Sequence, residues 1–255
     1  MSAPAAGRLV LVPNGLDLGT DIEVDLADVL PEAVLQQAAR LTHWVVENAK
    51  TARAFLKRVD RHVPLAQPLQ ALDIRELPRL RKGSATPTMP DVLPLLAPAL
   101  AGHDVGLLSE AGLPAVADPG SALVDAAHGA GIEVVPLSGP SSLMLALAAS
   151  GLNGQSFAFV GYLPVEATAR AARLKELESI SRRQHQTQIA IETPYRNAAL
   201  FAALVDHLGP STRLCVASGI TLPGGRCRTR TIADWRADRA VLADKVPAVF
   251  LWLAG

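Results

Sequence analysis

The residues best suited to chemistry lie in one polar stretch, SEAGLPAVADPG, at residues 109–120. It follows the apolar run 104–108, which predicts a buried strand. Glu110 supplies a carboxylate, Gly112 permits close approach of the backbone, and Pro114 stiffens the loop. Ligands in open α/β sheets bind beyond the carboxyl ends of the strands, so this loop is a candidate binding site. Its glycines and prolines also suit a tight turn between a strand and a helix.

A second candidate loop, LSGPSS at residues 137–142, follows the apolar run 132–136. It leads into small and aliphatic residues that predict a buried helix at 141–150. The first N–H groups of a helix have no partner within the helix, and they carry partial positive charge. This loop is therefore suited to meet a carboxylate of a ligand.

Several common sites have no counterpart in the sequence. GxGxxG, GxxxxGK[ST], HExxH and GxSxG motifs are all missing, and the six histidines are scattered. An ordinary dinucleotide or nucleoside triphosphate site is therefore not expected. Cys215 and Cys227 form no CxxC motif and have no histidines at ligand spacing. We expect free thiols in a reducing, cytoplasmic compartment, and no metal site.

Short apolar runs alternate with longer stretches rich in alanine and leucine, which predicts a mainly parallel α/β sheet in the first part of the chain. There we expect strands at 8–12, 44–46, 104–108 and 132–136, and helices at 31–41, 51–59, 91–100 and from a cap at Asp118 to Gly129 or Gly131. The alternation restarts after Pro136, with strands at 157–160, 188–191, 213–217, 228–232 and 248–253, and helices at 141–150, 166–182 and 197–208. The sequence thus predicts two α/β domains, residues 1–137 and 138–255.

The composition suits a globular protein with a sizeable core. Hydrophobic residues make up 49% and charged residues 19%, and the formal net charge is zero. This balance argues against a protein whose whole surface binds nucleic acid. The uncharged stretch 134–165 is broken by prolines and glycines, and the N-terminus has no apolar segment typical of a signal peptide. We therefore expect no membrane segment.

Four segments occur in an order and approximate spacing that resemble a known family. They are SEAGLPAVADPG (109–120), PLSGPSSLMLALAASGL (136–152), FVGYLP (159–164) and IETPYR (191–196). Together they are similar to the ribosomal RNA small-subunit methyltransferase I family, which is part of the tetrapyrrole methylase superfamily. WVVENAKTARAFL (44–56) also resembles an acidic-Asp-Thr-Arg segment of that family. The resemblance covers nearly the whole chain from Leu9.

This resemblance implies a class III methyltransferase, with two α/β domains, an S-adenosylmethionine cofactor in the cleft between them, and a homodimer. It implies methyl transfer to RNA, at a ribose 2′-hydroxyl of ribosomal RNA, with the small ribosomal subunit as a partner. The cofactor residues that it implies come from the first loop and the two glycine-containing motifs. They are Pro13, Ser109, Glu110, Ala111, Gly112, Asp118, Ser138, Gly139, Ser141 and Ser142.

The chain departs from the family pattern in three places. VPNGLD stands at 12–17 where the family usually has TPIGNL, SEAGLP replaces SDAGTP, and SGITLPGG at 218–225 replaces a REITK-type segment. These departures concern the methyl acceptor more than the cofactor. Two alternatives therefore remain: a small-molecule or tetrapyrrole-type methyltransferase, and a non-catalytic binding protein that retains the fold.

Transfer of a methyl group to a hydroxyl is helped by a base that accepts the proton. Glu47 and Glu192 are candidate bases, because each is expected at the carboxyl end of a strand. Each has an arginine nearby in sequence, Arg53 and Arg196, which makes these arginines candidate catalytic residues as well. Each pair is equally suited to a structural ion pair.

Three sets of basic residues are candidates for contact with RNA phosphates. One recurs at helical spacing, one follows in the proline-containing segment 64–90, and one alternates along an expected strand and therefore shares one face. The sets are Lys50, Arg53, Lys57 and Arg61; Arg75, Arg79, Arg81 and Lys82; and Arg226, Arg228 and Arg230. Ordinary solvated surface charge is the other interpretation of all three.

Overall fold

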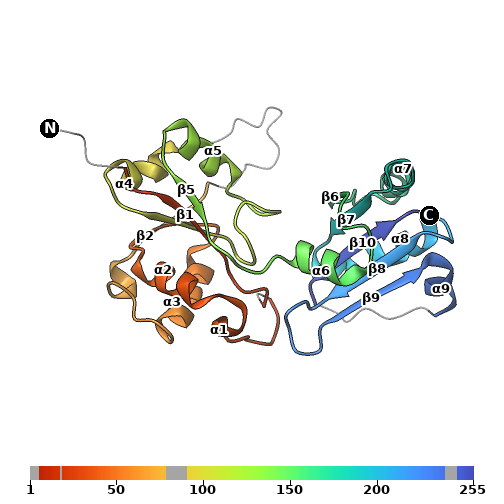
Figure 1. Cartoon of the computed structure of the whole chain (residues 1–255), viewed down its shortest axis with the longest axis horizontal. Helices are drawn as coiled ribbons and strands as arrows, with labels where there is room; N and C mark the ends of the chain where they lie inside the picture. Colours follow the sequence, from red (N-terminus) through yellow and green to blue (C-terminus); the bar gives the residue numbers. More distant parts are fainter. Residues whose placement is uncertain (1–5, 18, 79–90, 239–245) are drawn as a thin grey trace. The chain divides into compact units, whose positions relative to one another are not determined.

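The computed structural model describes residues 6–17, 19–78, 91–238 and 246–255. The chain forms two compact units, whose elements are labelled in Figure 1. The first unit comprises the chain up to Pro140 without Gly19–Glu23, and the second comprises Gly19–Glu23 and Ser141–Gly255. We place the domain boundary after Pro140, compared with the expected boundary after Leu137.

The first unit is built on a five-stranded sheet with the order β3-β2-β4-β1-β5. Its strands are β1 (Leu9–Val12), β2 (His43–Val46), β3 (Asp73–Glu76), β4 (Val105–Leu108) and β5 (Val134–Pro136). All four pairings are parallel, as the sequence predicted. The carboxyl ends of parallel strands meet at one edge, so the loops that follow β1, β2, β4 and β5 all begin there.

Helices cover both faces of this sheet (Figure 1). The helices α1 (Leu26–Val29), α2 (Glu32–Arg40) and α3 (Ala49–Asp60) supply the core on one face, with Val10, Val12, Trp44 and Val46 from the strands. The opposite face packs on the 3₁₀ helix η2 (Leu93–Leu96), α4 (Ala97–Leu100) and α5 (Ser121–Gly129), through Leu9, Val45, Val105 and Leu107. Successive strand residues alternate between the faces, so strands buried on both sides are apolar throughout.

The second unit has a mixed five-stranded sheet with the order β6-β7-β10-β8-β9. Its strands are β6 (Phe157–Tyr162), β7 (Thr187–Ile191), β8 (Arg213–Ser218), β9 (Arg226–Thr231) and β10 (Ala248–Leu253). β6 and β7 pair in parallel, and the other pairings are antiparallel. One face packs on α7 (Ala167–Gln184), α8 (Asn197–His207) and α9 (Ile232–Ala237), and the other on α6 (Ser142–Ser150). The predicted fold class, two α/β domains, is confirmed.

Two helix starts differ from the sequence prediction. Asp118 was expected to cap a helix, but α5 begins at Ser121 after Gly120, whose φ of 135° suits glycine, and no side chain caps it. That prediction is wrong because the chain turns once more before the helix begins. The helix α3 starts earlier than expected, at Ala49, because Asn48 Oδ1 accepts hydrogen bonds from the N–H groups of Lys50 (2.9 Å) and Thr51 (3.4 Å).

Two boundaries in the sheets also differ. The edge strand β3 was not predicted, because its sequence DIRE is polar and partly exposed and lies near several prolines. The strand expected at 228–232 ends at Thr231, whose side chain accepts the N–H of Asp234 (3.1 Å) and caps α9. In the parts of the chain that the structure describes, no helix is long and apolar enough to cross a membrane.

Candidate functional site

The loops that follow β1 and β4 are bonded to each other because these strands are neighbours in the sheet. We call residues 13–17 the first loop and residues 109–120 the glycine-proline loop. The N–H of Asn14 donates to the carbonyl of Gly112 (2.9 Å), and the N–H of Gly112 donates to the carbonyl of Gly15 (3.4 Å). These bonds form an antiparallel bridge beyond the sheet edge.

The glycine-proline loop has an unusual backbone. Gly112 and Gly120 have positive φ angles, of 65° and 135°, and so do Ala115 (65°) and Ala117 (64°). The left-handed conformation costs an alanine about 1–2 kcal/mol, because its Cβ approaches the following carbonyl oxygen. The loop therefore holds a conformation that its local sequence disfavours, and such strain is common at binding sites.

A pocket of about 630 Å³ lies beside this loop in the first unit, and we call it the acidic pocket. Its walls carry three carboxylates and come from the ends of β2 and β3 and from the glycine-proline loop. The lining residues are Glu47, Asn48, Leu77, Pro78, Glu110, Ala117, Asp118 and Pro119. The volume is within the range of small-molecule sites, and the carboxylates favour a cationic ligand.

Hydrogen bonds orient two of these carboxylates. Glu47, which follows β2, accepts the main-chain N–H of Glu110 at its Oε2 atom (3.2 Å). The carboxylate of Glu110 accepts the hydroxyl of Thr51 on α3 (3.2 Å). The structure therefore brings Glu47, Glu110 and Asp118 to one pocket, although the sequence predicted a different role for Glu47 than for the other two.

The third carboxylate, Asp118, has a perturbed acidity. Burial raises its pKa to about 6, and the negative charges of Glu47 and Glu110 contribute to the rise. Near neutral pH its carboxylate is therefore charged at a free-energy cost, and a nearby cation would relieve that cost. Strongly shifted groups of this kind are concentrated at functional sites.

Pro13 and Gly139, both predicted cofactor residues, are packed together. A Cβ atom added at Gly139 would overlap the ring of Pro13. The loop that follows β5 thus approaches the first loop closely only because residue 139 has no side chain. Ser138 lies in the same loop.

Gly139→Ala is therefore expected to destabilise the first unit by about 1–3 kcal/mol, because the new methyl group must displace Pro13. Chemical denaturation measures the change. Gly129→Ala is the matched control, since nothing lies within 4 Å of a Cβ at that helical position. A Gly139→Ala protein as stable as the control protein would contradict this packing.

The remaining predicted cofactor residues are Ser109 and Ala111, in the glycine-proline loop, and Ser141 and Ser142 of the second unit. Ser109 is buried, and its hydroxyl donates to the carbonyl of Ala111 (3.2 Å). Ser141 is the N-cap of α6, accepting the N–H of Met144 (3.5 Å), and Ser142 is the first residue of that helix. The helix expected at 141–150 is therefore present, with Ser141 as its cap and Ser142 as its first residue.

The two candidate catalytic pairs, Glu192 with Arg196 and Glu47 with Arg53, differ in their hydrogen-bond partners. Glu192 and Arg196 form an ion pair (2.7 Å), and Glu192 also accepts the N–H of Thr193 (2.7 Å). The Glu192 side chain is only 7% exposed, which favours the structural interpretation. Arg53 is exposed and donates to the carbonyl of Ala49 in its own helix (3.3 Å). Of the two candidate bases, Glu47 is the one that lines the acidic pocket.

Of the basic residues considered for RNA contact, Arg79, Arg81 and Lys82 lie outside the described residues, and two of the three on β9 are engaged within the second unit. Arg228 and Arg230 both pair with Asp238, at 3.3 and 2.7 Å. Their guanidinium groups also lie over the ring of Trp235, at 5.4 and 5.7 Å from its centroid. These contacts account for both arginines without nucleic acid.

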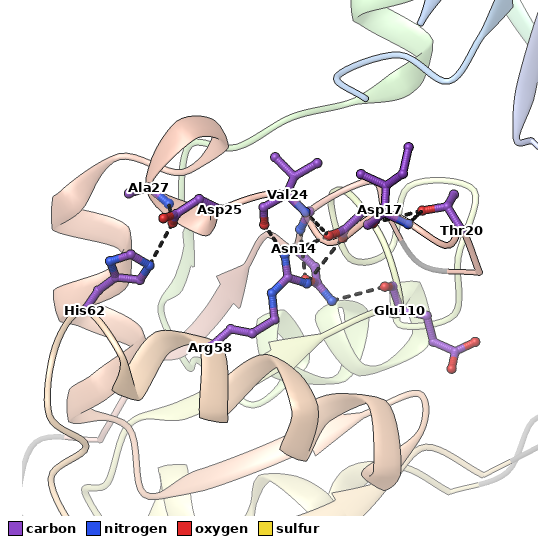
Figure 2. Close-up of polar contacts among 11 residues, drawn as sticks. Asn14, Asp17, Thr20, Val24, Asp25, Ala27, Arg58, His62 and Glu110 are labelled. Atoms are coloured by element: carbon purple, nitrogen blue, oxygen red, sulfur yellow. Dashed lines mark hydrogen bonds and ion pairs between the residues drawn. The ribbon is translucent and has the colours of Figure 1, made fainter. Parts of the chain in front are cut away.

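Three polar residues of the first unit were not recognised from the sequence: Asn14, which resembled an ordinary turn residue, Asp17 and Arg58. Arg58 on α3 pairs with the buried Asp17 of the first loop (2.8 Å) and donates to the carbonyl of Val24 (2.6 Å). The N–H of Val24 donates to Asp17 (2.9 Å), so Val24 is bonded to Asp17 both directly and through Arg58 (Figure 2). An aspartate and an arginine this far apart in sequence give no local signal of pairing.

The two cysteines are free, with Cys215 buried on β8 and Cys227 exposed on β9. Their Sγ atoms are 3.3 Å apart, although no local pattern indicated that they are neighbours. Burial raises the pKa of the Cys215 thiol to about 12. Within the described residues, no group of three or more His, Cys, Asp or Glu side chains is arranged to hold a metal ion.

Residues 33–235 match the family of Tetrapyrrole (Corrin/Porphyrin) Methylases. The chain belongs to this family. The predicted resemblance is therefore confirmed, and with it membership in a family of methyltransferases that use S-adenosylmethionine as the methyl donor.

Relatives of this chain are named ribosomal RNA small subunit methyltransferase I. The relative from Mesorhizobium japonicum is 39% identical over 59% of this chain and 49% of its own length. The relative from Xylella fastidiosa is 32% identical over 87% of this chain and 70% of its own length. The relative from Mycobacterium bovis is 28% identical over 98% of this chain and 74% of its own length. The match thus spans about half the length of the first of these relatives.

The fold is also similar to a solved structure, that of the methyltransferase CobJ. The TM-score is 0.54 at 18% sequence identity, with 98% of this chain and 95% of the other covered. At this level of identity the similarity concerns the fold alone.

Proposed function

We propose that this tetrapyrrole methylase family protein is an S-adenosylmethionine-dependent methyltransferase that acts on RNA, at a ribose 2′-hydroxyl of ribosomal RNA. The observation that carries the proposal is the acidic pocket beside the glycine-proline loop, with its three carboxylates. S-adenosylmethionine has a cationic sulfonium, and such carboxylates are suited to a cation. The names of the relatives support RNA as the acceptor.

The residues of this chain have distinct parts in the proposed reaction. When bound, S-adenosylmethionine supplies a methyl group already activated for transfer. Glu110 and Asp118 provide negative charge for the donor, and the glycine-proline loop provides closely approaching backbone at Gly112. Glu47, held by the N–H of Glu110, is positioned to accept the proton of the attacking hydroxyl. Glu192 is less suited to this role, since its side chain is largely buried and its Oε1 atom already accepts bonds from Arg196 and from the N–H of Thr193.

Donor binding is tested by calorimetry with S-adenosylmethionine and with its demethylated product. Binding of either at micromolar concentrations is expected. No binding of either at high micromolar concentration would overturn the proposed cofactor.

The acceptor is tested by methylation of RNA from a strain that lacks this gene, with modified nucleosides identified by mass spectrometry. A 2′-O-methylated ribonucleoside in small-subunit RNA is the expected product. Glu47→Gln should lower the rate by about 10²- to 10⁴-fold while the donor still binds, whereas Glu192→Gln should leave donor binding and most of the rate intact. Equal losses in both variants would contradict the assignment of Glu47.

A small-molecule acceptor is the second candidate. The zero net charge and the internal contacts of Arg228 and Arg230 favour it over RNA. Binding to RNA with a steep dependence on salt would decide for RNA. Methyl transfer to any acceptor would eliminate a non-catalytic protein that retains the fold.

The partners of the proposed enzyme are the small ribosomal subunit and a second copy of this chain. The ribosomal partner follows from the names of the relatives, and the second copy follows from the family resemblance of the sequence motifs. Light scattering coupled to gel filtration measures the mass in solution, and a monomer would contradict the homodimer.

A further inference from the structure

Asn14 is a buried polar residue whose side chain is held by several hydrogen bonds. It is 6% exposed and directly follows Pro13 in the first loop. Its Nδ2 atom donates to the carbonyls of Ser109 (3.3 Å) and Glu110 (3.1 Å), and its Oδ1 atom accepts the N–H of Gly15 (2.8 Å). Figure 2 shows this side chain between the first loop and Glu110. Both N–H groups and the oxygen of the Asn14 carboxamide therefore form hydrogen bonds with main-chain groups of the first unit.

Only a carboxamide satisfies this set of partners. The two N–H groups of Asn14 Nδ2 face the main-chain carbonyl oxygens of Ser109 and Glu110, and Asn14 Oδ1 faces the N–H of Gly15. The reverse orientation of the amide would place oxygen against oxygen, so the network fixes the orientation. An ionised aspartate lacks the donors, and so does the isoleucine that the family's usual TPIGNL loop has at this position.

The two carbonyls belong to a segment that is held from its other side as well. The N–H of Glu110 donates to Glu47, and the carbonyl of Gly112 accepts the N–H of Asn14 itself. Asn14 therefore bonds the main chain at Ser109, Glu110 and Gly112. These are three of the residues proposed to bind the methyl donor, and Glu47 is the proposed base.

We propose that Asn14 is a positioning residue, whose carboxamide holds the main chain at residues 109–112 in the conformation that binds the methyl donor. The proposal rests on the proposed function for the identity of the ligand, but not for the hydrogen bonds. It gives the VPNGLD sequence of this chain a role of its own, since Asn14 replaces an apolar side chain by a polar cross-link between two loops.

Asn14→Ala tests the positioning in the unliganded protein by hydrogen exchange of the amides of Glu110 and Gly112. Loss of the two hydrogen bonds from Asn14 Nδ2 is expected to lower the protection of these amides about tenfold or more. The affinity for S-adenosylmethionine, measured by calorimetry, should fall by about tenfold or more as well. Asp104→Asn is the control, because Asp104 precedes the other end of β4 and bonds Arg8 there (2.6 Å). It should leave both readouts at the wild-type values.

Asn14→Asp supplies a readout that general destabilisation does not affect. An ionised aspartate cannot donate, but a protonated one of the same shape donates one hydrogen bond. Protection at residues 109–112 should therefore be lost at pH 8 and partly recovered at pH 5 in Asn14→Asp, and not in Asn14→Ala. The titratable and charged groups that face this region are Asp17, Glu47, Arg58, Glu110 and Asp118. Wild-type protein measured at each pH corrects for their contribution.

The outcomes separate the two proposals. If wild-type protein binds no donor, the proposed function fails, while the exchange data still decide the role of Asn14. If Asn14→Ala changes protection and affinity less than twofold, or Asn14→Asp shows no recovery at low pH, the positioning role is overturned.

Discussion

Arg58→Met is expected to destabilise the first unit by about 3–5 kcal/mol, because it breaks a buried ion pair by removing one partner. The side chain of Asp17 is 6% exposed and that of Arg58 15%. Replacement of Arg58 removes the positive charge that the guanidinium supplies to this buried carboxylate, and it also removes the donor to the Val24 carbonyl. Chemical denaturation measures the loss, and hydrogen exchange of β4 assigns it to the first unit.

The control for this substitution lies on the same helix. Arg53 is exposed and bonds the carbonyl of Ala49 within α3, so Arg53→Met should change stability by less than about 0.5 kcal/mol. Adding Asp17→Asn to Arg58→Met should restore part of the stability, because the buried charge is then absent. A loss below about 1 kcal/mol for Arg58→Met would show that Asp17 is solvated rather than buried.

Asp118→Asn should make the protein more stable at neutral pH and a weaker binder of the methyl donor. The pKa of Asp118 is about 6 in the folded protein, raised by burial and by Glu47 and Glu110. Because the folded state binds the proton more tightly than the unfolded state, wild-type stability falls as the pH rises from about 4 through 6. An asparagine does not titrate, so the variant should gain on the order of 1–2 kcal/mol above pH 6 and little at pH 4, after allowance for partial solvation.

The affinity for S-adenosylmethionine at pH 7.5 should fall by about tenfold or more, since a charged partner of the cation is lost. Denaturation at pH 4 and pH 7.5 and calorimetry at pH 7.5 give the two readouts. Asp104→Asn should have the opposite effect on stability. Hydrogen bonding by Arg8 lowers the pKa of Asp104. Replacement of this carboxylate should therefore reduce stability at neutral pH. An Asp118→Asn protein that binds the donor as tightly as wild type would exclude this carboxylate from the site.

Local signals in the sequence predicted much of the fold. The apolar runs of the central strands were found at nearly the expected residues, and the buried helix expected at 141–150 is α6. The motifs also identified the glycine-proline loop, since its glycines and its carboxylate are visible in one short segment. Short-range patterns suffice where hydrophobic periodicity and caps decide the structure.

The remaining features depend on contacts between distant residues. In the sequence, Asn14 resembles an ordinary turn residue, because its role depends on β1 and β4 being neighbours in the sheet. Its partners lie 95 and 96 residues further along the chain. Asp118 precedes a proline and resembles a helix cap, but the positive φ at Gly120 delays the helix and leaves Asp118 at the pocket. The polar edge strand β3 is recognisable only by its pairing with β2.

The strand order of the first sheet has a consequence for synthesis on the ribosome. β1 emerges first, yet Leu9 pairs with Val105 on one side and Val134 on the other. The four apolar residues of β1 therefore have neither of their neighbouring strands to pair with until most of the first unit has been translated. Such non-local pairing is slow and leaves apolar surface open to association. Nascent chains arrested before Val134 should be sensitive to protease and should bind chaperones, and chains extended well beyond Pro140 should resist both.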